Sequence, residues 1–259
     1  TLTSEAPWQD LDLHRYPPPQ PAELRERLAD LYGVEPDQLL VTRGSDEGID
    51  LLLRVFCRAG KDRILETIPC FGMYRVSAAI QGAAIVAVPR RAEKDFQVDV
   101  DALCSAIARD PRIRLVFLTS PNNPTGTWIT RGDLERFLEK VPEDVIVVLD
   151  EAYVEFVTDP EFPDYFELRK RFANLASMRS FSKIYSLAAL RLGYLLASEE
   201  VVGLVQRVRQ PFNANRIAQR AASVALRHQD RVAERRAANR RGLDQLAAGL
   251  HALGCSTLP

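Results

Sequence analysis

Cysteine and histidine are scarce in this sequence of 259 residues, and their placement excludes several kinds of site. The cysteines stand far apart, at Cys57, Cys70, Cys104 and Cys255, and no two of them form a C-x-x-C pair. This spacing predicts neither a disulfide framework nor a cysteine metal site, and it indicates reduced thiols in a cytoplasmic protein. The three histidines are equally scattered, so the sequence predicts no metal site of any kind.

Long apolar runs and an excess of one charge are also missing. No apolar segment reaches the roughly 18 residues that a membrane span needs, and no basic-then-apolar signal segment begins at Thr1. The 34 basic and 35 acidic residues give a formal net charge of −1, which provides no general attraction to nucleic acid or to an anionic membrane. The composition, 46% hydrophobic and 27% charged, is that of a globular protein, and 259 residues are enough for one large α/β domain or two unequal domains.

Short apolar or β-branched runs alternate with helical patterns along most of the chain. The runs occupy residues 39–42, 63–66, 83–88, 115–119, 145–150, 175–180 and 192–197, and helical patterns occupy residues 22–32, 46–58, 72–81, 99–108 and 130–139. The run at 145–149 is continuously apolar, which is typical of strands that are covered on both faces. The pattern predicts an α/β fold with a mostly parallel seven-stranded sheet flanked by helices.

Three segments of different character predict the domain organisation. Residues 1–20 are rich in proline, which lacks a backbone donor, and this favours an extended N-terminal arm. Residues 21–210 carry the strand-and-helix alternation and form the predicted large domain. Residues 211–259 have long helical patterns, at 217–228 and 231–253, and are predicted to be connecting helices and the start of a smaller domain.

Polar segments follow four of the predicted strands at the point where each strand ends. They are residues 43–48, 120–126, 150–153 and 180–183. Because ligands bind beyond the carboxyl ends of the strands in an open parallel sheet, these segments predict a binding site at one edge of the sheet. The first segment contains neither G-x-G-x-x-G nor G-x-x-x-x-G-K-[ST], so a dinucleotide site or a P-loop loses its main support.

Each polar segment also allows a purely structural interpretation. Ser45 and Asp46 could cap a helix, or they could face a phosphate at the helix N-terminus. Asp150 ends an apolar strand, and a buried carboxylate needs a cationic partner, which could be an arginine or a protonated pyridine nitrogen. Lys183 could reach solvent, and Arg191 could be a surface charge or part of a phosphate clamp. The residues alone leave these alternatives open.

Several strings of residues resemble those of a known enzyme family. The strings S-P-N-N-P-T-G at 120–126, D-E-A-Y at 150–153 and S-x-S-K-x-x-x-L-x-x-L-R-x-G-Y at 180–194 resemble the fold-type-I pyridoxal-phosphate aminotransferases. Further strings, R-Y-P at 15–17, R-G-S-D-E-G-I at 43–49 and F-G-M-Y at 71–74, are similar to the histidinol-phosphate aminotransferase family. The resemblance extends from about Glu5 to the region near Gln219.

The resemblance implies a role for each residue around the cofactor ring. Lys183 would carry pyridoxal 5'-phosphate as a Schiff base and would transfer the proton in catalysis. Asp150 would keep the pyridine nitrogen protonated, and Asn123 and Tyr153 would hydrogen-bond the ring oxygen O3′. Lys183, Asp150 and Tyr153 are the implied catalytic residues. Phe71 would stack on the ring, at a position where many members of the family have tyrosine.

The resemblance also implies how the cofactor phosphate is held and that two chains cooperate. The implied phosphate-binding residues are Ser45, Asp46, Ser180, Ser182 and Arg191. Tyr16, in the arm, is similar to the tyrosine that reaches the cofactor phosphate of the neighbouring subunit. The protein is therefore expected to be a homodimer with shared active sites.

The implied reaction transfers an amino group between L-histidinol phosphate and 2-oxoglutarate, with glutamate as its partner, in histidine biosynthesis. A threonine-phosphate decarboxylase-like lyase, an aromatic aminotransferase and a non-catalytic cofactor-binding paralogue remain alternatives, and the string S-K-I-Y at 182–185 is somewhat closer to the lyase. Two features depart from the family. Ser4 stands where asparagine is usual, and members continue past Pro259 through a small domain that supplies arginines for the substrate. The chain is thus either a truncated relative or part of a longer protein.

Overall fold

The computed structural model describes residues 11–258, and its centre is a seven-stranded sheet. The strands are β1 (Leu39–Thr42), β2 (Arg63–Ile68), β3 (Ala84–Pro89), β4 (Ile113–Thr119), β5 (Ile146–Asp150), β6 (Leu175–Ser180) and β7 (Gly193–Leu196). Their spatial order is β1-β7-β6-β5-β4-β2-β3. Strand β7 is antiparallel to both β1 and β6, and the other neighbours are parallel. The predicted mostly parallel sheet is therefore confirmed.

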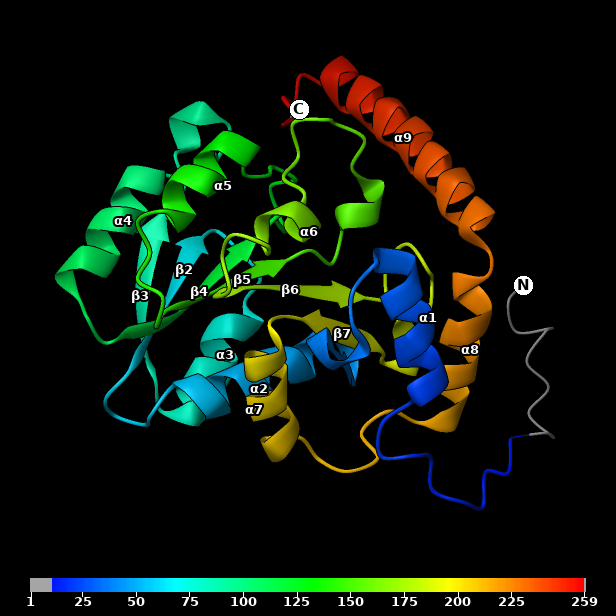
Figure 1. Cartoon of the computed structure of the whole chain (residues 1–259). Helices are drawn as coiled ribbons and strands as arrows, with labels where there is room; N and C mark the ends of the chain where they lie inside the picture. The colour runs from blue at the N-terminus through cyan, green and yellow to red at the C-terminus, as the bar shows by residue number, and fades with distance from the viewer. Residues whose placement is uncertain (1–10, 259) are drawn as a thin grey trace.

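Helices cover both faces of this sheet (Figure 1). They are α1 (Ala22–Tyr32), α2 (Gly44–Phe56), α3 (Met73–Gln81), α4 (Val100–Arg109), α5 (Arg131–Leu138), α6 (Tyr165–Leu168), α7 (Glu199–Val208), α8 (Arg216–Leu226) and α9 (Gln229–Ala252). Short 3₁₀ turns lie at η3 (Pro36–Gln38), η4 (Ala92–Lys94), η5 (Val154–Phe156) and η6 (Ala188–Leu190). The predicted strands and helices all occur, with ends that differ by no more than two residues.

The two faces of the sheet build two separate apolar cores. Successive strand residues point to opposite faces, so Val116 and Leu118 enter one core, whereas Leu115 and Phe117 enter the other. The first core also contains apolar residues of α1, α4, α5, α6 and α8. The second contains those of α2, α3 and α7. This arrangement explains why the strand sequences are continuously apolar.

The direction of the strands brings four polar segments to one edge of the sheet. Strands β1 and β6 both run antiparallel to β7, and therefore they run in the same direction as each other. Strands β4 and β5 are parallel to β6 in turn. The carboxyl ends of β1, β4, β5 and β6 consequently meet at the same edge, as the sequence predicts.

The last two helices differ in how they contact the rest of the protein. Helix α8 packs against α1 and contributes Ala218 and Ala222 to the first core. Helix α9 buries only Val232, and it leaves Leu243 and Leu246 exposed as it runs along the outside of the protein (Figure 1). The division of the chain into an arm, a large domain and a connecting segment stays a prediction.

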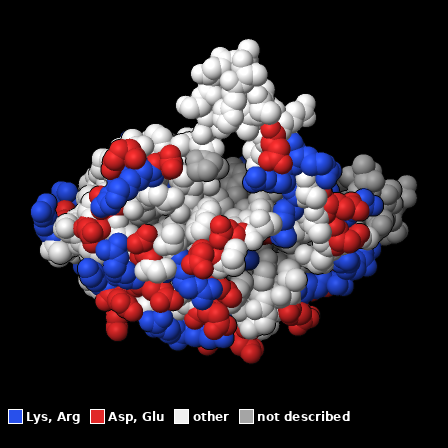
Figure 2. Space-filling view, turned by 90° about the horizontal axis from the view of Figure 1, so that it is seen from above, with Lys and Arg blue, Asp and Glu red and all other residues white. Residues whose placement is uncertain are grey.

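One face of the molecule has mixed charge. Basic and acidic side chains lie interspersed on the face that Figure 2 shows. None of the helices between residues 11 and 258 combines the length and the apolar character that a membrane span requires.

A buried ion pair fixes the chain just after β5. Glu151 is fully buried, and its Oε2 accepts hydrogen bonds from Nε and Nη2 of Arg179 on β6, at 3.0 and 2.8 Å. The Arg179 guanidinium also lies 5.0 Å from the ring centroids of Tyr32 and Phe166. Breaking such a pair by removing one partner leaves an uncompensated buried charge. Glu151 therefore ties the end of β5, which carries Asp150, to β6.

A second carboxylate in the same region predicts a pH dependence of stability. Neither carboxylate oxygen of Glu155 reaches solvent or finds a hydrogen-bond partner among residues 11–258, although the residue as a whole is half-buried. Burial raises the pKa of Glu155 from its ordinary 4.5 to about 7, with a smaller opposing effect of Arg179. The folded state therefore holds this proton more tightly than the unfolded state does.

Because the folded-state pKa is the higher one, stability should fall as the pH rises from about 4.5 to about 7. The shift corresponds to roughly 3 kcal/mol of unfolding free energy. Urea unfolding of the wild-type protein and of Glu155→Gln at several pH values would measure it. We expect the variant to lose this part of the pH dependence. If the free energy of unfolding changed with pH equally in the two proteins, the prediction would be contradicted.

Candidate active site

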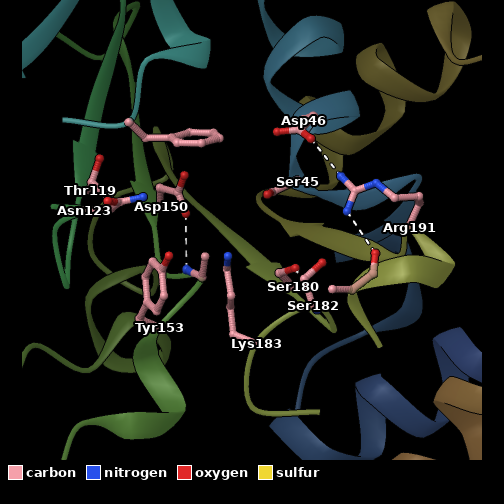
Figure 3. A pocket seen from close by; sticks show the side chains of 13 residues that line it. Ser45, Asp46, Thr119, Asn123, Asp150, Tyr153, Ser180, Ser182, Lys183 and Arg191 are labelled. Carbon is pink, nitrogen blue, oxygen red and sulfur yellow. Dashed lines mark hydrogen bonds and ion pairs between the residues drawn. The ribbon is translucent and has the colours of Figure 1, made fainter. Parts of the chain in front are cut away.

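A pocket opens at the edge of the sheet where the carboxyl ends of the strands meet (Figure 3). Its lining comes from α2, from the segments after β2, β4, β5 and β6, and from η6. The lining residues are Ser45, Asp46, Phe71, Thr119, Asn123, Asp150, Ala152, Tyr153, Ser180, Ser182, Lys183, Ala188 and Arg191. The labelled side chains form two groups in Figure 3, with Lys183 between them.

One group lies at the N-terminus of α2. The helix begins at Gly44, so the backbone N–H groups of its first turn, including that of Ser45, have no partner within the helix. Arg191 lies beside this turn, where Nη2 donates to Oδ2 of Asp46 at 2.8 Å and Nη1 donates to the carbonyl of Ala188 at 3.2 Å. Backbone donors, a helix dipole and a guanidinium thus converge at this end of the pocket, an arrangement that suits an anion.

The capping alternative for Ser45 and Asp46 is wrong. The N-cap of α2 is Arg43, and no side chain caps it; the Asp46 carboxylate instead pairs with Arg191. The end of β6 and the loop that follows it add the hydroxyls of Ser180 and Ser182 to the anion end, and Oγ of Ser180 accepts the Ser182 N–H at 3.0 Å. Asp46 can therefore face an anion only through its backbone N–H.

Two glycines allow this close packing. Gly44 has a φ of +74°, and a Cβ there would lie 2.8 Å from Nη2 of Arg191. A Cβ on Gly193 of β7 would lie 2.8 Å from the backbone nitrogen of Ser45 and 2.9 Å from the carbonyl carbon of Gly44. Because backbone atoms cannot move aside as a flexible side chain can, Gly193 is needed for the start of α2 to rest on β7.

The second group surrounds a buried carboxylate. Asp150 is 3% exposed; its Oδ1 accepts the Ala152 N–H at 3.1 Å, and its Oδ2 accepts a hydrogen bond from the Tyr74 hydroxyl at 2.6 Å. Burial raises the pKa of the Asp150 carboxyl above its ordinary value, and these two hydrogen bonds act in the opposite direction. No lysine or arginine among residues 11–258 forms an ion pair with Asp150, so the arginine alternative is wrong for the described part of the chain. The carboxylate lacks a cation.

Lys183 stands between the two groups (Figure 3). Its Nζ lies 5.2 Å from the ring centroid of Tyr153, which belongs to the same group as Asp150. The lysine is exposed and lines the pocket, so its amine is open to a ligand that enters there. A ligand with an anionic group at the α2 end and a cationic group near Asp150 would pass directly in front of this amine.

The structure brings together ten of the eleven predicted site residues, and Tyr16 is the exception. Tyr16 is 79% exposed, and its ring stacks on Phe212 at a centroid distance of 4.8 Å. It lines a separate groove of the same chain with residues near Pro211 and Arg216, and Arg216 donates to its carbonyl at 2.9 Å. Tyr16 therefore does not reach the pocket of its own chain.

Two residues near the Asp150 carboxylate, Thr119 and Tyr74, are not among the predicted site residues. Thr119 lines the pocket at the end of β4. Tyr74 on α3 donates a hydrogen bond to the Asp150 carboxylate, and its hydroxyl also contacts that of Thr119. The string F-G-M-Y contains Tyr74, but the family resemblance implies a role only for Phe71 in it. No group of three or more histidine, cysteine, aspartate or glutamate side chains within residues 11–258 is arranged to hold a metal ion.

Comparison with known proteins identifies the family. The family profile described as aminotransferase class I and II matches residues 9–259. The chain belongs to this family. This class I and II aminotransferase chain is 44% identical over 247 residues to the histidinol-phosphate aminotransferase of Anaeromyxobacter sp. (strain Fw109-5), an alignment that covers 95% of the chain and 66% of the relative.

Solved structures show the same aminotransferase fold. The histidinol-phosphate aminotransferase of Sinorhizobium meliloti, in complex with pyridoxal-5'-phosphate, matches with a TM-score of 0.86 and 28% identity, over 96% of this chain and 66% of that one. The L-threonine-O-3-phosphate decarboxylase of Porphyromonas gingivalis matches with a TM-score of 0.72 and 27% identity, over 86% of this chain and 64% of that one. The aminotransferase chain thus spans slightly less than two thirds of the length of these relatives.

Proposed function

We propose that the protein containing this chain is a pyridoxal-phosphate-dependent histidinol-phosphate aminotransferase. It would transfer an amino group between L-histidinol phosphate and 2-oxoglutarate, with glutamate as the corresponding amino acid, in histidine biosynthesis. The observation that carries the proposal is the placement of Lys183 between the cation-lacking carboxylate of Asp150 and the anion site at the N-terminus of α2. The similarity to named histidinol-phosphate aminotransferases supports the choice of reaction.

The residues of the pocket fit pyridoxal 5'-phosphate at each of its functional groups. The phosphate would lie against the first turn of α2 near Ser45, with Arg191 and the hydroxyls of Ser180 and Ser182 around it. The protonated pyridine nitrogen would supply the cation that Asp150 lacks. When bound, this cofactor supplies an aldehyde that carries the amino group between substrates and a ring that withdraws electrons.

Each side chain around the bound cofactor would then have its own role. Lys183 would hold the cofactor covalently through its Nζ and, once a substrate amine has taken its place, would move the proton at the substrate Cα. Asp150 would hold a proton on the ring nitrogen, and Tyr153 and Asn123 would donate hydrogen bonds to the ring oxygen. Phe71, which lines the same pocket, would stack on the ring.

A homodimer is the assembly that best explains Tyr16. This residue is exposed and stands outside the pocket of its own chain, stacked on Phe212. A tyrosine that serves the pocket of a second copy has to project from its own subunit in this way. A cytoplasmic location is also part of this proposal, and the four free cysteines support it; Cys57 is buried and Cys255 is exposed.

A decarboxylase acting on a phosphorylated amino acid is the second candidate. The similarity to the L-threonine-O-3-phosphate decarboxylase favours it, as does the pair Ile184-Tyr185 after the lysine. The two reactions leave the cofactor in different forms. Transamination converts it to pyridoxamine phosphate, whereas decarboxylation releases carbon dioxide and leaves it as pyridoxal phosphate.

A half-reaction with the full-length protein tests the proposal. The holoenzyme would be mixed with L-histidinol phosphate, glutamate, L-threonine O-3-phosphate or phenylalanine, each without a second substrate. We expect L-histidinol phosphate and glutamate to convert the cofactor to pyridoxamine phosphate without release of carbon dioxide. Release of carbon dioxide from the threonine derivative would favour the decarboxylase instead, and conversion by phenylalanine alone would favour an aromatic aminotransferase.

A further inference from the structure

A buried tyrosine contacts both Asp150, proposed to bind the ring nitrogen of the cofactor, and Phe71, proposed to stack on the ring. Tyr74 is fully buried on α3, and its hydroxyl donates a hydrogen bond of 2.6 Å to Oδ2 of Asp150. The same hydroxyl lies 2.8 Å from Oγ1 of Thr119. The Tyr74 ring stacks on Phe117 at a centroid distance of 4.6 Å and meets Phe71 edge-on at 5.8 Å. Its position is therefore fixed by packing on both sides.

The direction of each hydrogen bond follows from the number of available protons. Burial, and after it the charge of Asp150, raise the pKa of Tyr74 well above its ordinary value, so the hydroxyl stays protonated. Its single proton goes to Asp150, and Thr119 must therefore donate its own hydroxyl proton to Tyr74. Every hydrogen bond between the Asp150 side chain and the described residues is consequently one that the carboxylate accepts.

Strand pairing and hydrogen bonds around its backbone hold Thr119 in place. It is paired with Asp150 in the register of β4 and β5, and the N–H of Ser120 donates to the carbonyl of Asp150 at 3.0 Å. The buried side chain of Arg90 donates from Nη2 to the Thr119 carbonyl at 3.0 Å. The hydroxyl of Thr119 is thus presented to Tyr74 from a rigid strand end.

We propose that Thr119 and Tyr74 form a positioning relay, in which each donates its proton toward Asp150 and so keeps this carboxylate ionised and aimed at the cofactor ring nitrogen. The relay rests on the proposed function. Hydrogen bonds to a charged carboxylate oppose the burial that would protonate it. Without them, the proton shared by the carboxyl and the ring nitrogen would move toward the carboxyl.

Replacing Tyr74 by phenylalanine tests the relay and keeps the stacked ring. The full-length protein would be reconstituted with pyridoxal phosphate that carries ¹⁵N in its ring, and the ¹⁵N resonance would report the protonation of that nitrogen. In Tyr74→Phe we expect the resonance to shift toward that of an unprotonated pyridine, and the cofactor dissociation constant to rise roughly 10- to 100-fold. Tyr165→Phe is the matched control, because Tyr165 is equally buried but lies outside the pocket on α6.

Substitutions of Thr119 test whether it acts through Tyr74. Thr119→Val should weaken cofactor binding about 3- to 10-fold, and Thr119→Ser, which keeps the hydroxyl, should restore it. The double variant Tyr74→Phe/Thr119→Val should bind no more weakly than Tyr74→Phe alone, because the threonine has lost its acceptor. Thr67→Val is the matched control, since Thr67 is a buried threonine on β2 outside the pocket.

The outcomes separate the relay from the proposed function. If the wild-type protein binds the cofactor at Lys183, but Tyr74→Phe keeps both the wild-type affinity and a protonated ring nitrogen, the relay is overturned and the proposed function stands. Additive effects of the two substitutions would also overturn it. A wild-type protein that binds no cofactor would overturn the proposed function and the relay with it.

Discussion

Replacing Lys183 by alanine should remove essentially all transamination, with turnover lower by roughly 10⁴-fold or more. The variant loses both the amine that would hold the cofactor and the base that would move the substrate proton, and no other lysine of the described chain lines the pocket. Borohydride reduction followed by peptide mass spectrometry measures the covalent attachment directly. We expect the reduced cofactor on the peptide that contains Lys183 in the wild-type protein and on no peptide of the variant.

Two further variants control this result. Lys183→Arg keeps a cation in the pocket but lacks a reactive amine, so it should be as inactive as Lys183→Ala. Lys170→Ala removes a surface lysine, which pairs with Glu167, and should leave turnover unchanged. Wild-type turnover in Lys183→Ala would refute the assignment of this lysine, and with it the proposed function.

Replacing Asp150 by alanine should leave the covalent attachment intact and lower turnover on the order of 10³-fold. The reason is electrostatic: without the buried carboxylate, the ring nitrogen would have no anionic partner, because the other carboxylate among the described lining residues, Asp46, lies in the opposite group (Figure 3). Turnover would be measured at saturating cofactor, so that weaker cofactor binding does not contribute to the loss.

Asp150→Asn distinguishes charge from shape at this position. Asparagine fills the same space and can accept the Ala152 N–H, but it carries no negative charge. We expect it to be as impaired as Asp150→Ala. If the asparagine variant retained full turnover, the carboxylate would matter only for packing, and a protonated ring nitrogen would not be required.

The sequence predicts most of the fold because its strands are buried on both faces. Runs such as β5, which is buried at every position, stand out from the helical patterns around them. Helix α6 was not predicted, since it has only four residues and no amphipathic period can be recognised over that length. Strand order could not be predicted either: β7 lies between β1 and β6, which only tertiary packing decides.

The site was predicted as a set of residues, but not as a set of contacts. The strand-end segments placed Lys183 and Asp150 at one edge, which the pocket confirms. The pairing of the Asp46 carboxylate with Arg191 joins residues far apart in the sequence and leaves no local signal. The orientation of Tyr74 depends on which face of α3 packs on the sheet, and a string of four residues does not contain that information.

The position of β7 sets the order in which the pocket can form. Gly44 and Ser45 rest on Gly193, although a large part of the chain separates them. Within residues 11–258, β1 pairs with β7 alone, and the chain must therefore be complete to Leu196 before the start of α2 has a surface to lie on. During synthesis, all seven strands would have to leave the ribosome before the anion site at the N-terminus of α2 can form. Capture of the cofactor by a growing chain would accordingly show that β7 has already paired with β1.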